Sequence, residues 1–204
     1  MLTVSAHRLQ GPDVMQDATD HHDGVIQPRL IVFHFTAISF GDTLAKFKHG
    51  TPGNRVSAHL VVARNGQIVQ FVDFNLRVWH AGPSVWSGLS DINSHSIGIE
   101  LANAGTVSQT GAQWIGEEGV AVPADEVIEA RHKNARWPMT HWHRYADAQI
   151  EACRAMTSAL LRAYPIDDIV GHDDIAPERK YDPGPAFPLA AIRESAFGER
   201  HPKT

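Results

Sequence analysis

Short apolar runs alternate with polar segments along the chain, and the periodicity of each run predicts its secondary structure. Residues 30–36 (LIVFHFT) are almost continuously apolar, which is typical of a strand buried on both faces. Residues 96–101 (SIGIEL) alternate, so the large apolar side chains share one face while Gly98 and Glu100 share the other. Two strands of a central sheet are expected at these positions.

A β-hairpin is predicted between residues 56 and 72. Two β-rich runs, at 56–63 and 67–72, flank the dipeptide Asn65-Gly66. Asn-Gly between such runs is the strongest short-range signal for a hairpin. A hairpin supplies antiparallel neighbours, whereas strands joined by longer crossovers run parallel, so the sheet is expected to be mixed.

Helical periodicity is clearest at residues 145–164, where apolar side chains recur on one face and Pro165 ends the pattern. Shorter helices are expected at 42–49 and 189–197, and a short strand at 169–172. Strands mixed with helices predict the α/β class, with a mixed central β-sheet flanked by helices.

The length of 204 residues fits a single domain. We expect one domain over residues 1–204, with an irregular lead-in at 1–28 and an insertion at 103–144. Glycine and proline recur through the insertion, which predicts a surface excursion with a short helix near 124–131.

Composition excludes several classes of protein. The net charge of −5 argues against a nucleic acid as the main partner, because proteins that bind nucleic acids usually carry a basic face. No apolar run is long enough to predict a membrane span, and residues 1–10 lack the apolar core of a secretory signal. These features predict a cytoplasmic protein, although a chain shortened at its N-terminus would look the same.

Three residues from separate segments offer the ligand types of a catalytic zinc site. His34 lies in the first apolar run, His172 follows a short strand, and Asp182 lies in the proline-rich loop 177–188. Two imidazoles and a carboxylate leave the fourth position of a tetrahedral zinc ion for water. The residues alone leave two alternatives open: a hydrogen-bonded core histidine at position 34, and a loop whose charges face solvent.

Glu100 and Lys180 are candidates for proton transfer and charge stabilisation. A carboxylate on a buried strand is costly unless it is paired or functional, so Glu100 is either half of a buried salt bridge or a general base. Lys180 and Asp182 are two residues apart, and in an extended segment they point to the same side. The neighbouring Asp173 and Asp174 are expected to fix the loop or the ring of His172 rather than to bind metal.

Five ordered motifs resemble those of the N-acetylmuramoyl-L-alanine amidases of the AmpD type, relatives of phage amidase endolysins and animal peptidoglycan recognition proteins. The resemblance extends from about residue 30 to residue 195 and is interrupted by the insertion at 103–144. The motifs are RVSAH at 55–59, RNGQIVQFV at 64–72, WHAG at 79–82, SIGIEL at 96–101 and GHDDIAPERKYDPGP at 171–185.

The resemblance implies one zinc ion per chain in a surface cleft, held by His34, His172 and Asp182. It also implies that Glu100 assists the attacking water and that Lys180 stabilises the developing negative charge. The implied reaction is hydrolysis of the amide bond between N-acetylmuramic acid, or its anhydro form, and L-alanine. The implied partners are peptidoglycan fragments, and the expected setting is cell-wall recycling.

Two further residues, Arg55 and His80, match positions near the substrate in this family. The segment after Trp86 (SGLSDINSH) lacks the arginines expected there in close relatives, so the resemblance implies the metal site but not the family's contacts with the substrate peptide. Two alternative functions remain: a phage-type endolysin that acts on the intact wall, and a peptidoglycan-binding module without catalysis.

The insertion at 103–144 leaves the predicted sheet directly after Glu100-Leu101-Ala102. A strand that ends at a catalytic residue delivers the next loop to the rim of the site, so the insertion is expected to border the cleft. Its three tryptophans, Trp114, Trp137 and Trp142, are candidates for substrate contact. The alternative is a surface excursion that packs away from the cleft.

Overall fold

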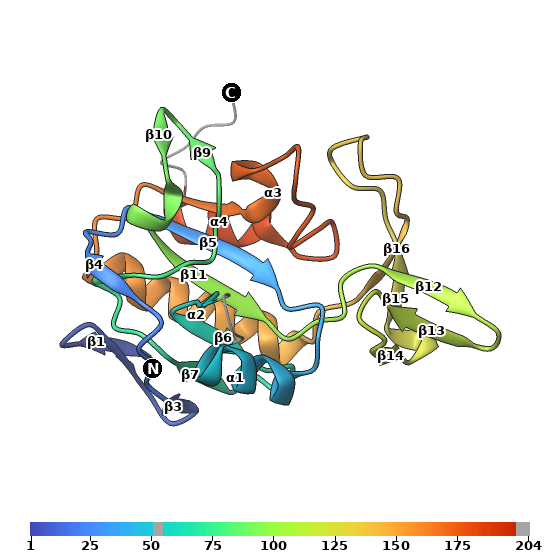
Figure 1. Ribbon diagram of the computed structural model, residues 1–204, viewed down its shortest axis with the longest axis horizontal. Helices are drawn as coiled ribbons and strands as arrows, with labels where there is room; N and C mark the ends of the chain where they lie inside the picture. Colours follow the sequence, from blue (N-terminus) through green and yellow to red (C-terminus); the bar gives the residue numbers. More distant parts are fainter. Residues whose placement is uncertain (51–54, 199–204) are drawn as a thin grey trace.

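The computed structural model describes residues 1–50 and 55–198. A six-stranded sheet forms its centre, in the order β17-β5-β11-β6-β7-β3 (Figure 1). Neighbouring strands are parallel except for the antiparallel pair β6 and β7, so the predicted mixed sheet is confirmed. The strands are β3 (Val14–Gln16), β5 (Leu30–Phe35), β6 (Leu60–Val62), β7 (Ile68–Gln70), β11 (Ser96–Leu101) and β17 (Asp168–Gly171).

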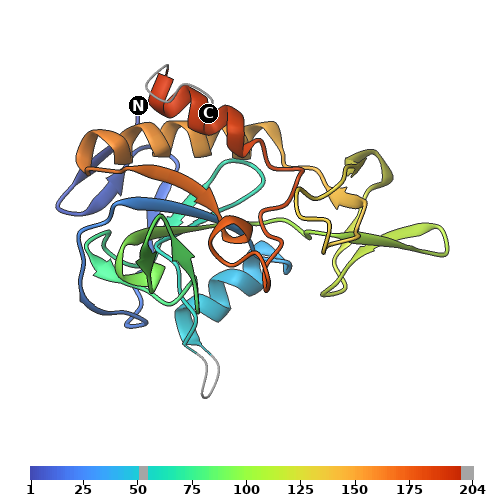
Figure 2. The same cartoon turned by 90° about the horizontal axis from the view of Figure 1, so that it is seen from above.

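Helices cover the two faces of this sheet. Helices α2 (Asp147–Ala163) and α4 (Leu189–Phe197) lie on one face and α1 (Phe40–His49) on the other (Figure 2). Helix α3 (His172–Ile175) is a single turn that follows β17. The helices predicted at 42–49, 145–164 and 189–197 are confirmed. Among the described residues no helix has the length and apolar character needed to cross a membrane.

The alternation of β11 divides its side chains between two environments. Ile97, Ile99 and Leu101 pack with α2 in the main hydrophobic core, where they are fully buried. Gly98 and Glu100 point to the opposite face, as predicted from the alternation, because successive strand residues face opposite sides. The polar site therefore forms on the face that carries α1.

The N-terminal 28 residues are not irregular, and this expectation was wrong. Strands β1 (Thr3–Ser5) and β2 (Arg8–Gln10) form a hairpin, β3 pairs in parallel with β7, and β4 (Asp23–Val25) pairs with β8 (Leu76–Arg77). Leu9 is fully buried, and its backbone N–H donates to Oε1 of Gln70 at 2.7 Å. Strands of three residues are too short to show a period, so only their pairing reveals them.

The insertion is built from strands rather than from the short helix expected near 124–131. A single 3-10 turn at Ala124–Glu126 leads into β15 (Val127–Glu129). The segment is a strand and not a helix because Val127 and Ile128 pair with β16 (His141–His143). The insertion projects from one end of the central sheet (Figure 1). Its other strands are β12 (Val107–Thr110), β13 (Gln113–Gly116) and β14 (Ala121–Val122), and a separate hairpin pairs β9 (Val85–Trp86) with β10 (Leu89–Ser90).

Candidate metal centre and cleft

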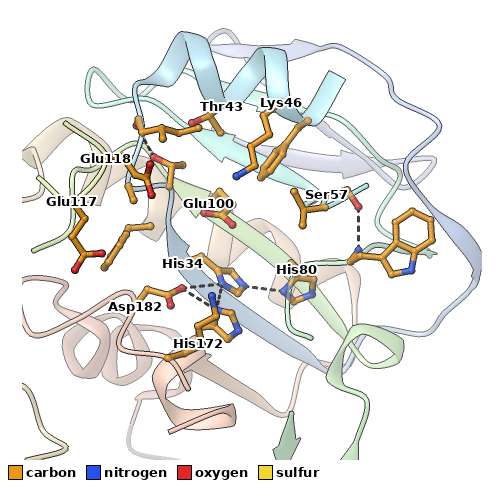
Figure 3. A pocket seen from close by; sticks show the side chains of 18 of the residues that line it. His34, Thr43, Lys46, Ser57, His80, Glu100, Glu117, Glu118, His172 and Asp182 are labelled. Carbon is orange, nitrogen blue, oxygen red and sulfur yellow. Dashed lines mark hydrogen bonds and ion pairs between the residues drawn. The ribbon is translucent and has the colours of Figure 1, made fainter. Parts of the chain in front are cut away.

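Three predicted ligands meet at the carboxyl ends of two neighbouring strands. His34 lies near the end of β5, and His172 directly follows the adjacent parallel strand β17. The loop after α3 returns Asp182 to the same point, and all three side chains are buried. Nδ1 of His34 lies 2.9 Å from Nδ1 of His172, and Oδ2 of Asp182 lies 3.1 and 3.0 Å from these two nitrogens (Figure 3).

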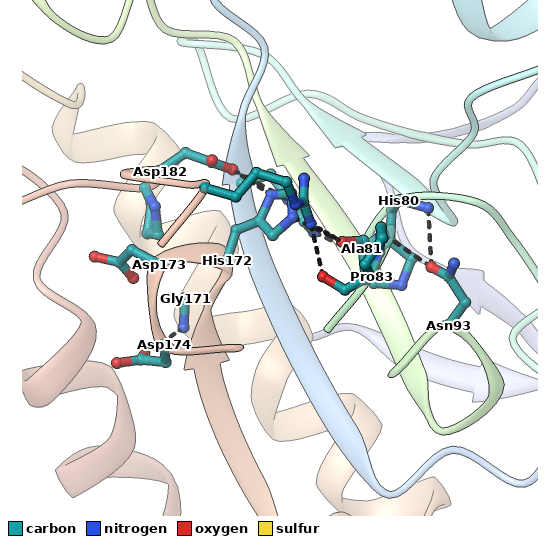
Figure 4. A network of polar contacts seen from close by, with 12 residues as sticks. His80, Ala81, Pro83, Asn93, Gly171, His172, Asp173, Asp174 and Asp182 are labelled. Carbon is teal, nitrogen blue, oxygen red and sulfur yellow. Dashed lines mark hydrogen bonds and ion pairs between the residues drawn. The ribbon is translucent and has the colours of Figure 1, made fainter. Parts of the chain in front are cut away.

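Hydrogen bonding fixes the tautomer of the His172 ring. Its Nε2 lies 3.0 Å from the carbonyl oxygen of Ala81 (Figure 4). A carbonyl only accepts, so Nε2 carries the proton and Nδ1 of the neutral ring presents a lone pair. Arg179 donates to the same carbonyl at 2.6 Å, and Asn93 accepts from the backbone N–H of Ala81 at 2.8 Å, which holds this acceptor in place.

A chain of hydrogen bonds through His80, Ser96 and the carbonyl of Ile92 fixes the His34 ring in the same tautomer, with the proton on Nε2. Ser96 donates its hydroxyl proton to the carbonyl of Ile92 at 2.7 Å, so its oxygen accepts from Nε2 of His80 at 3.0 Å. Nδ1 of His80 is then an acceptor, and Nε2–H of His34 donates to it at 2.8 Å. Nδ1 of His34 is left with a lone pair that faces His172 and Asp182.

In these tautomers no proton lies between the three atoms that face one another, which are Nδ1 of His34, Nδ1 of His172 and Oδ2 of Asp182. Burial, and next the neighbouring His172, lower the pKa of His34 to about 4, so the ring is neutral at pH 7. The two histidines hold the pKa of Asp182 well below its usual range despite its burial. Two nitrogen lone pairs and a carboxylate within 3.1 Å of one another repel unless a cation lies between them. The donor set therefore fits a small divalent metal ion.

A cleft of about 320 Å³ opens above these ligands. Glu100 pairs directly with His34 across β11 and β5, which places both at the cleft floor. Lys180 and His80 also line the cleft, together with residues of α1 and of the insertion. Helix α1 forms one wall of the cleft, with Thr43 and Lys46, and the insertion forms another, with Glu117 and Glu118 (Figure 3).

Glu100 lies in this cleft without a partner. Its Oε2 is buried and has no hydrogen-bond partner, and within the described part of the chain Glu100 forms no ion pair. Burial, and next the charge of Asp182, raise the pKa of Glu100 to about 8, against the opposing effect of Lys180 and Lys46. The alternative of a buried salt bridge is therefore not what the structure shows, and an unpaired carboxyl remains available for proton transfer.

The raised pKa of Glu100 predicts a pH-dependent loss of stability in the metal-free protein. The unfolded carboxyl ionises near pH 4.5 and the folded one near pH 8, so the free energy of unfolding falls as the pH rises between these values. Glu100→Gln removes this loss, because glutamine does not ionise. In chelator-treated protein the free energy of unfolding of the variant, relative to that of the wild type, should rise by up to about 5 kcal/mol between pH 5 and pH 8. Urea unfolding from pH 5 to 9 measures it. A difference that does not change with pH would contradict the shift.

Of the two expected substrate contacts, His80 lines the cleft and Arg55 does not. Arg55 is exposed and is not among the residues lining the cleft, and it donates to the backbone oxygen of Asp20 at 2.7 Å. Its guanidinium lies 5.7 Å from the ring centroid of Trp79. His80 lines the cleft, and its ring fills the space beside Gly98, where a Cβ would come within 2.5 Å of it. Its hydrogen bond to His34 gives it a positioning role.

The insertion borders the cleft, but not through its tryptophans. Glu117 and Glu118 line the cleft, whereas Trp114, Trp137 and Trp142 do not. Trp137 and Trp142 pack against Tyr181, with ring centroids 5.2 and 6.3 Å from it, and so support the loop that carries Asp182. Lys46 was not identified from the sequence as a cleft residue. The available signal was its spacing of three residues from Thr43, which places both on one face of α1.

A second part of the insertion clamps the loop of His172. Nε2 of His132 donates to Oδ2 of Asp173 at 3.0 Å, and both side chains are buried. Lys133 contacts Asp173 at 3.0 Å and Asp174 at 2.5 Å, while Asp174 also accepts from the backbone N–H of Gly171. Asp173 in turn donates its backbone N–H to the carbonyl of Asp182 at 2.8 Å. The two aspartates fix the loop, which is the role expected for them.

His132→Leu is expected to lower the free energy of unfolding by about 2–3 kcal/mol, because it removes a hydrogen bond to a buried carboxylate. Urea unfolding of the metal-free protein measures the change. His141→Leu, at the half-buried first residue of β16, is the matched control and should cost less than about 1 kcal/mol. Equal losses in the two variants would show that the hydrogen bond between His132 and Asp173 adds nothing to stability.

Comparison with known proteins gives consistent matches. A family model described as N-acetylmuramoyl-L-alanine amidase matches residues 25–185. The 1,6-anhydro-N-acetylmuramyl-L-alanine amidase AmpD of Escherichia coli (strain K12) is 38% identical over 141 residues, which cover 68% of this chain and 57% of AmpD. The N-acetylmuramoyl-L-alanine amidase AmiD of the same organism is 30% identical over 179 residues, or 83% of this chain and 54% of AmiD. The matched region thus spans little more than half of each relative.

Solved structures share the fold. A crystal structure of a selenomethionine derivative of AmpD superposes with a TM-score of 0.64 at 30% identity, covering 91% of this chain and 96% of that chain. The complex of E. coli AmiD with anhydro-N-acetylmuramic acid-L-Ala-D-γ-Glu-L-Lys gives 0.60 at 27% identity, covering 95% of this chain and 65% of that chain.

Proposed function

The chain belongs to the N-acetylmuramoyl-L-alanine amidase family, and from this membership we propose that it hydrolyses the amide bond between N-acetylmuramic acid, or its 1,6-anhydro form, and L-alanine in peptidoglycan fragments. One observation carries the proposal: the lone pairs of His34, His172 and Asp182 converge beside the unpartnered carboxyl of Glu100.

We assign His34, His172 and Asp182 as the ligands of one zinc ion per chain. Zinc bound there would polarise the scissile carbonyl, lower the pKa of a water molecule and favour the ionised form of Glu100. The neutral tautomers fixed by Ala81 and His80 support this assignment, since both rings present Nδ1 to the same point. These hydrogen bonds orient the rings before any ligand arrives.

Glu100 acts as the general base. Its carboxylate takes one proton from the attacking water as the oxygen bonds to the carbonyl carbon. The same proton then passes to the nitrogen of L-alanine, which allows the carbon–nitrogen bond to break and the amine to leave. The products are the muramoyl carboxylate and a peptide with a free amino group.

Lys180 stabilises the negative oxygen of the tetrahedral intermediate. It lines the cleft two residues from Asp182, and its charge acts on both His34 and Glu100. A preorganised positive charge at a developing oxyanion contributes roughly 3–4 kcal/mol to catalysis. The substrate lies in the cleft between α1 and the insertion, with its scissile amide above His34.

The names of two relatives specify the anhydro sugar, and on this ground we favour soluble anhydro-muropeptides, as in cell-wall recycling, over the intact wall. The test supplies the zinc-loaded protein with anhydro-N-acetylmuramic acid-L-Ala-D-γ-Glu-L-Lys and, separately, with intact sacculi, and identifies products by mass spectrometry. The proposal expects the anhydro-sugar acid and the free tripeptide, formed much faster than any fragment from sacculi. Faster release from sacculi would indicate an endolysin, and binding without cleavage a recognition module.

A further inference from the structure

The described part of the chain contains four lysines, and they divide by their surroundings. Lys48 pairs with Asp17 at 2.5 Å, and Lys133 pairs with Asp173 and Asp174. Among residues 1–50 and 55–198, Lys46 and Lys180 form no ion pair. Both of these line the cleft.

Lys46 and Lys180 reach the cleft from different elements, α1 and the loop of Asp182. Lys46 lies on α1 one helical turn after Thr43, on the face that turns toward the site, and its side chain extends toward Glu100 (Figure 3). Its charge acts on Glu100. Lys180, by contrast, comes from the loop of Asp182, next to the reacting carbonyl, so the two lysines serve different parts of a bound substrate.

The walls of the cleft differ in charge. Lys46 lies on the α1 wall, while Glu117 and Glu118 lie on the insertion wall. Glu117 already accepts from Thr106 at 3.0 Å and from the hydroxyl of Tyr181. A substrate carboxylate is therefore attracted to the α1 wall and repelled from the insertion wall.

The proposed substrate carries its negative charge only on the peptide, because the lactyl carboxyl of the sugar is consumed in the scissile amide. In the L-Ala-D-γ-Glu-L-Lys stem the γ linkage leaves the α-carboxylate of D-glutamate free, about one residue beyond the leaving nitrogen, or roughly 4–7 Å. This is the carboxylate nearest the reacting bond. Residues 87–95 supply no arginine for it, and Arg55 is held by Asp20 outside the cleft lining. Arg179 does line the cleft, but its guanidinium donates to the backbone carbonyls of Ala81 and Pro83.

We propose that Lys46 binds the free α-carboxylate of the γ-linked D-glutamate and so sets the specificity of the cleft for the acidic stem peptide. This inference rests on the proposed function. It makes Lys46 a specificity residue that acts on substrate binding, and it places the peptide along α1 with the amine of its third residue toward Glu118. A substrate in which this carboxylate is amidated, D-isoglutamine, has no charge for Lys46 to bind.

The test measures kcat/KM for muramoyl-L-Ala-D-γ-Glu-L-Lys and for its D-isoglutamine counterpart in four proteins: the wild type, Lys46→Met, Lys46→Arg and Lys48→Met. We expect the wild type to prefer the free carboxylate by about 10-fold, mainly through KM, as for a hydrogen bond to a charged group. Lys46→Met should abolish the preference, Lys46→Arg should retain it, and Lys48→Met, which changes the charge of the same helix away from the cleft, should leave it intact.

Several results would overturn the inference. Equal cleavage of both substrates by the wild type would do so while leaving the proposed function in place. An equal loss in kcat on both substrates in Lys46→Met, with a shifted pH profile, would show that Lys46 acts on Glu100 instead. Cleavage of neither substrate would remove the proposed function itself. Calorimetric titration of the two peptides into the Glu100→Gln protein provides a second readout, in which only Lys46→Met should equalise the two affinities.

Discussion

Replacing Glu100 by glutamine is expected to lower kcat/KM for the muropeptide amide by about 100- to 10,000-fold, the range for loss of a general base. Glutamine keeps the shape of the side chain on β11 but cannot accept the proton of the attacking water. The fall should appear in kcat, since among the described residues Glu100 has no hydrogen-bond partner whose loss would disturb substrate binding. Steady-state kinetics with product detection by mass spectrometry measures it.

The control for this variant is Glu129→Gln, which makes the same change at the exposed position of β15 in the insertion and should retain full activity. Elemental analysis should find the same zinc content in both variants and in the wild type. Activity within a few-fold of the wild type in folded, zinc-loaded Glu100→Gln would mean that Glu100 is structural and that another group moves the proton.

Replacing Asp182 by asparagine is expected to remove both zinc and activity. The loss of outer hydrogen-bond partners typically weakens metal binding by 10- to 100-fold, so the loss of a charged ligand should exceed about 100-fold. The carboxylate is also the only negative charge among the three ligands, and without it two buried neutral imidazoles must hold a dication. Competition with a chromophoric chelator measures the affinity.

Asp174→Asn is the matched control, because Asp174 lies near the site but contacts Lys133 and the backbone of Gly171 instead of the ligand cluster. After chelation and addition of zinc, the wild type and Asp174→Asn should regain activity and Asp182→Asn should not. A full complement of tightly bound zinc in Asp182→Asn would show that the three residues are not the ligand set.

The sequence predicted the elements whose periodicity is long enough to recognise. The alternation at residues 96–101 placed Glu100 on the face opposite the core, and the apolar run at 30–36 identified the strand that carries His34. The lead-in and the insertion were misjudged, since strands of two to four residues are defined by pairing with distant segments, as β3 is by β7.

The contacts that orient the site could not be predicted, because the decisive ones join residues far apart in the chain. His132 and Asp173 are separated by 41 residues, and the tautomer of His34 depends on a chain of hydrogen bonds through His80 and Ser96. The position of Lys46 depends on how α1 packs over the sheet, which the sequence of the helix alone does not determine. Residue types and spacing therefore identify candidate ligands, and the fold determines which partners orient them.

The most direct test of the account is hydrolysis of anhydro-N-acetylmuramic acid-L-Ala-D-γ-Glu-L-Lys by the zinc-loaded protein in water enriched in oxygen-18. Mass spectrometry of both products shows which bond was cut and where the water oxygen went. The account predicts a single oxygen-18 in the lactyl carboxylate of the sugar product and none in the tripeptide, which leaves with a free L-alanine amine. Label in the peptide, cleavage at another bond, or no turnover would contradict it.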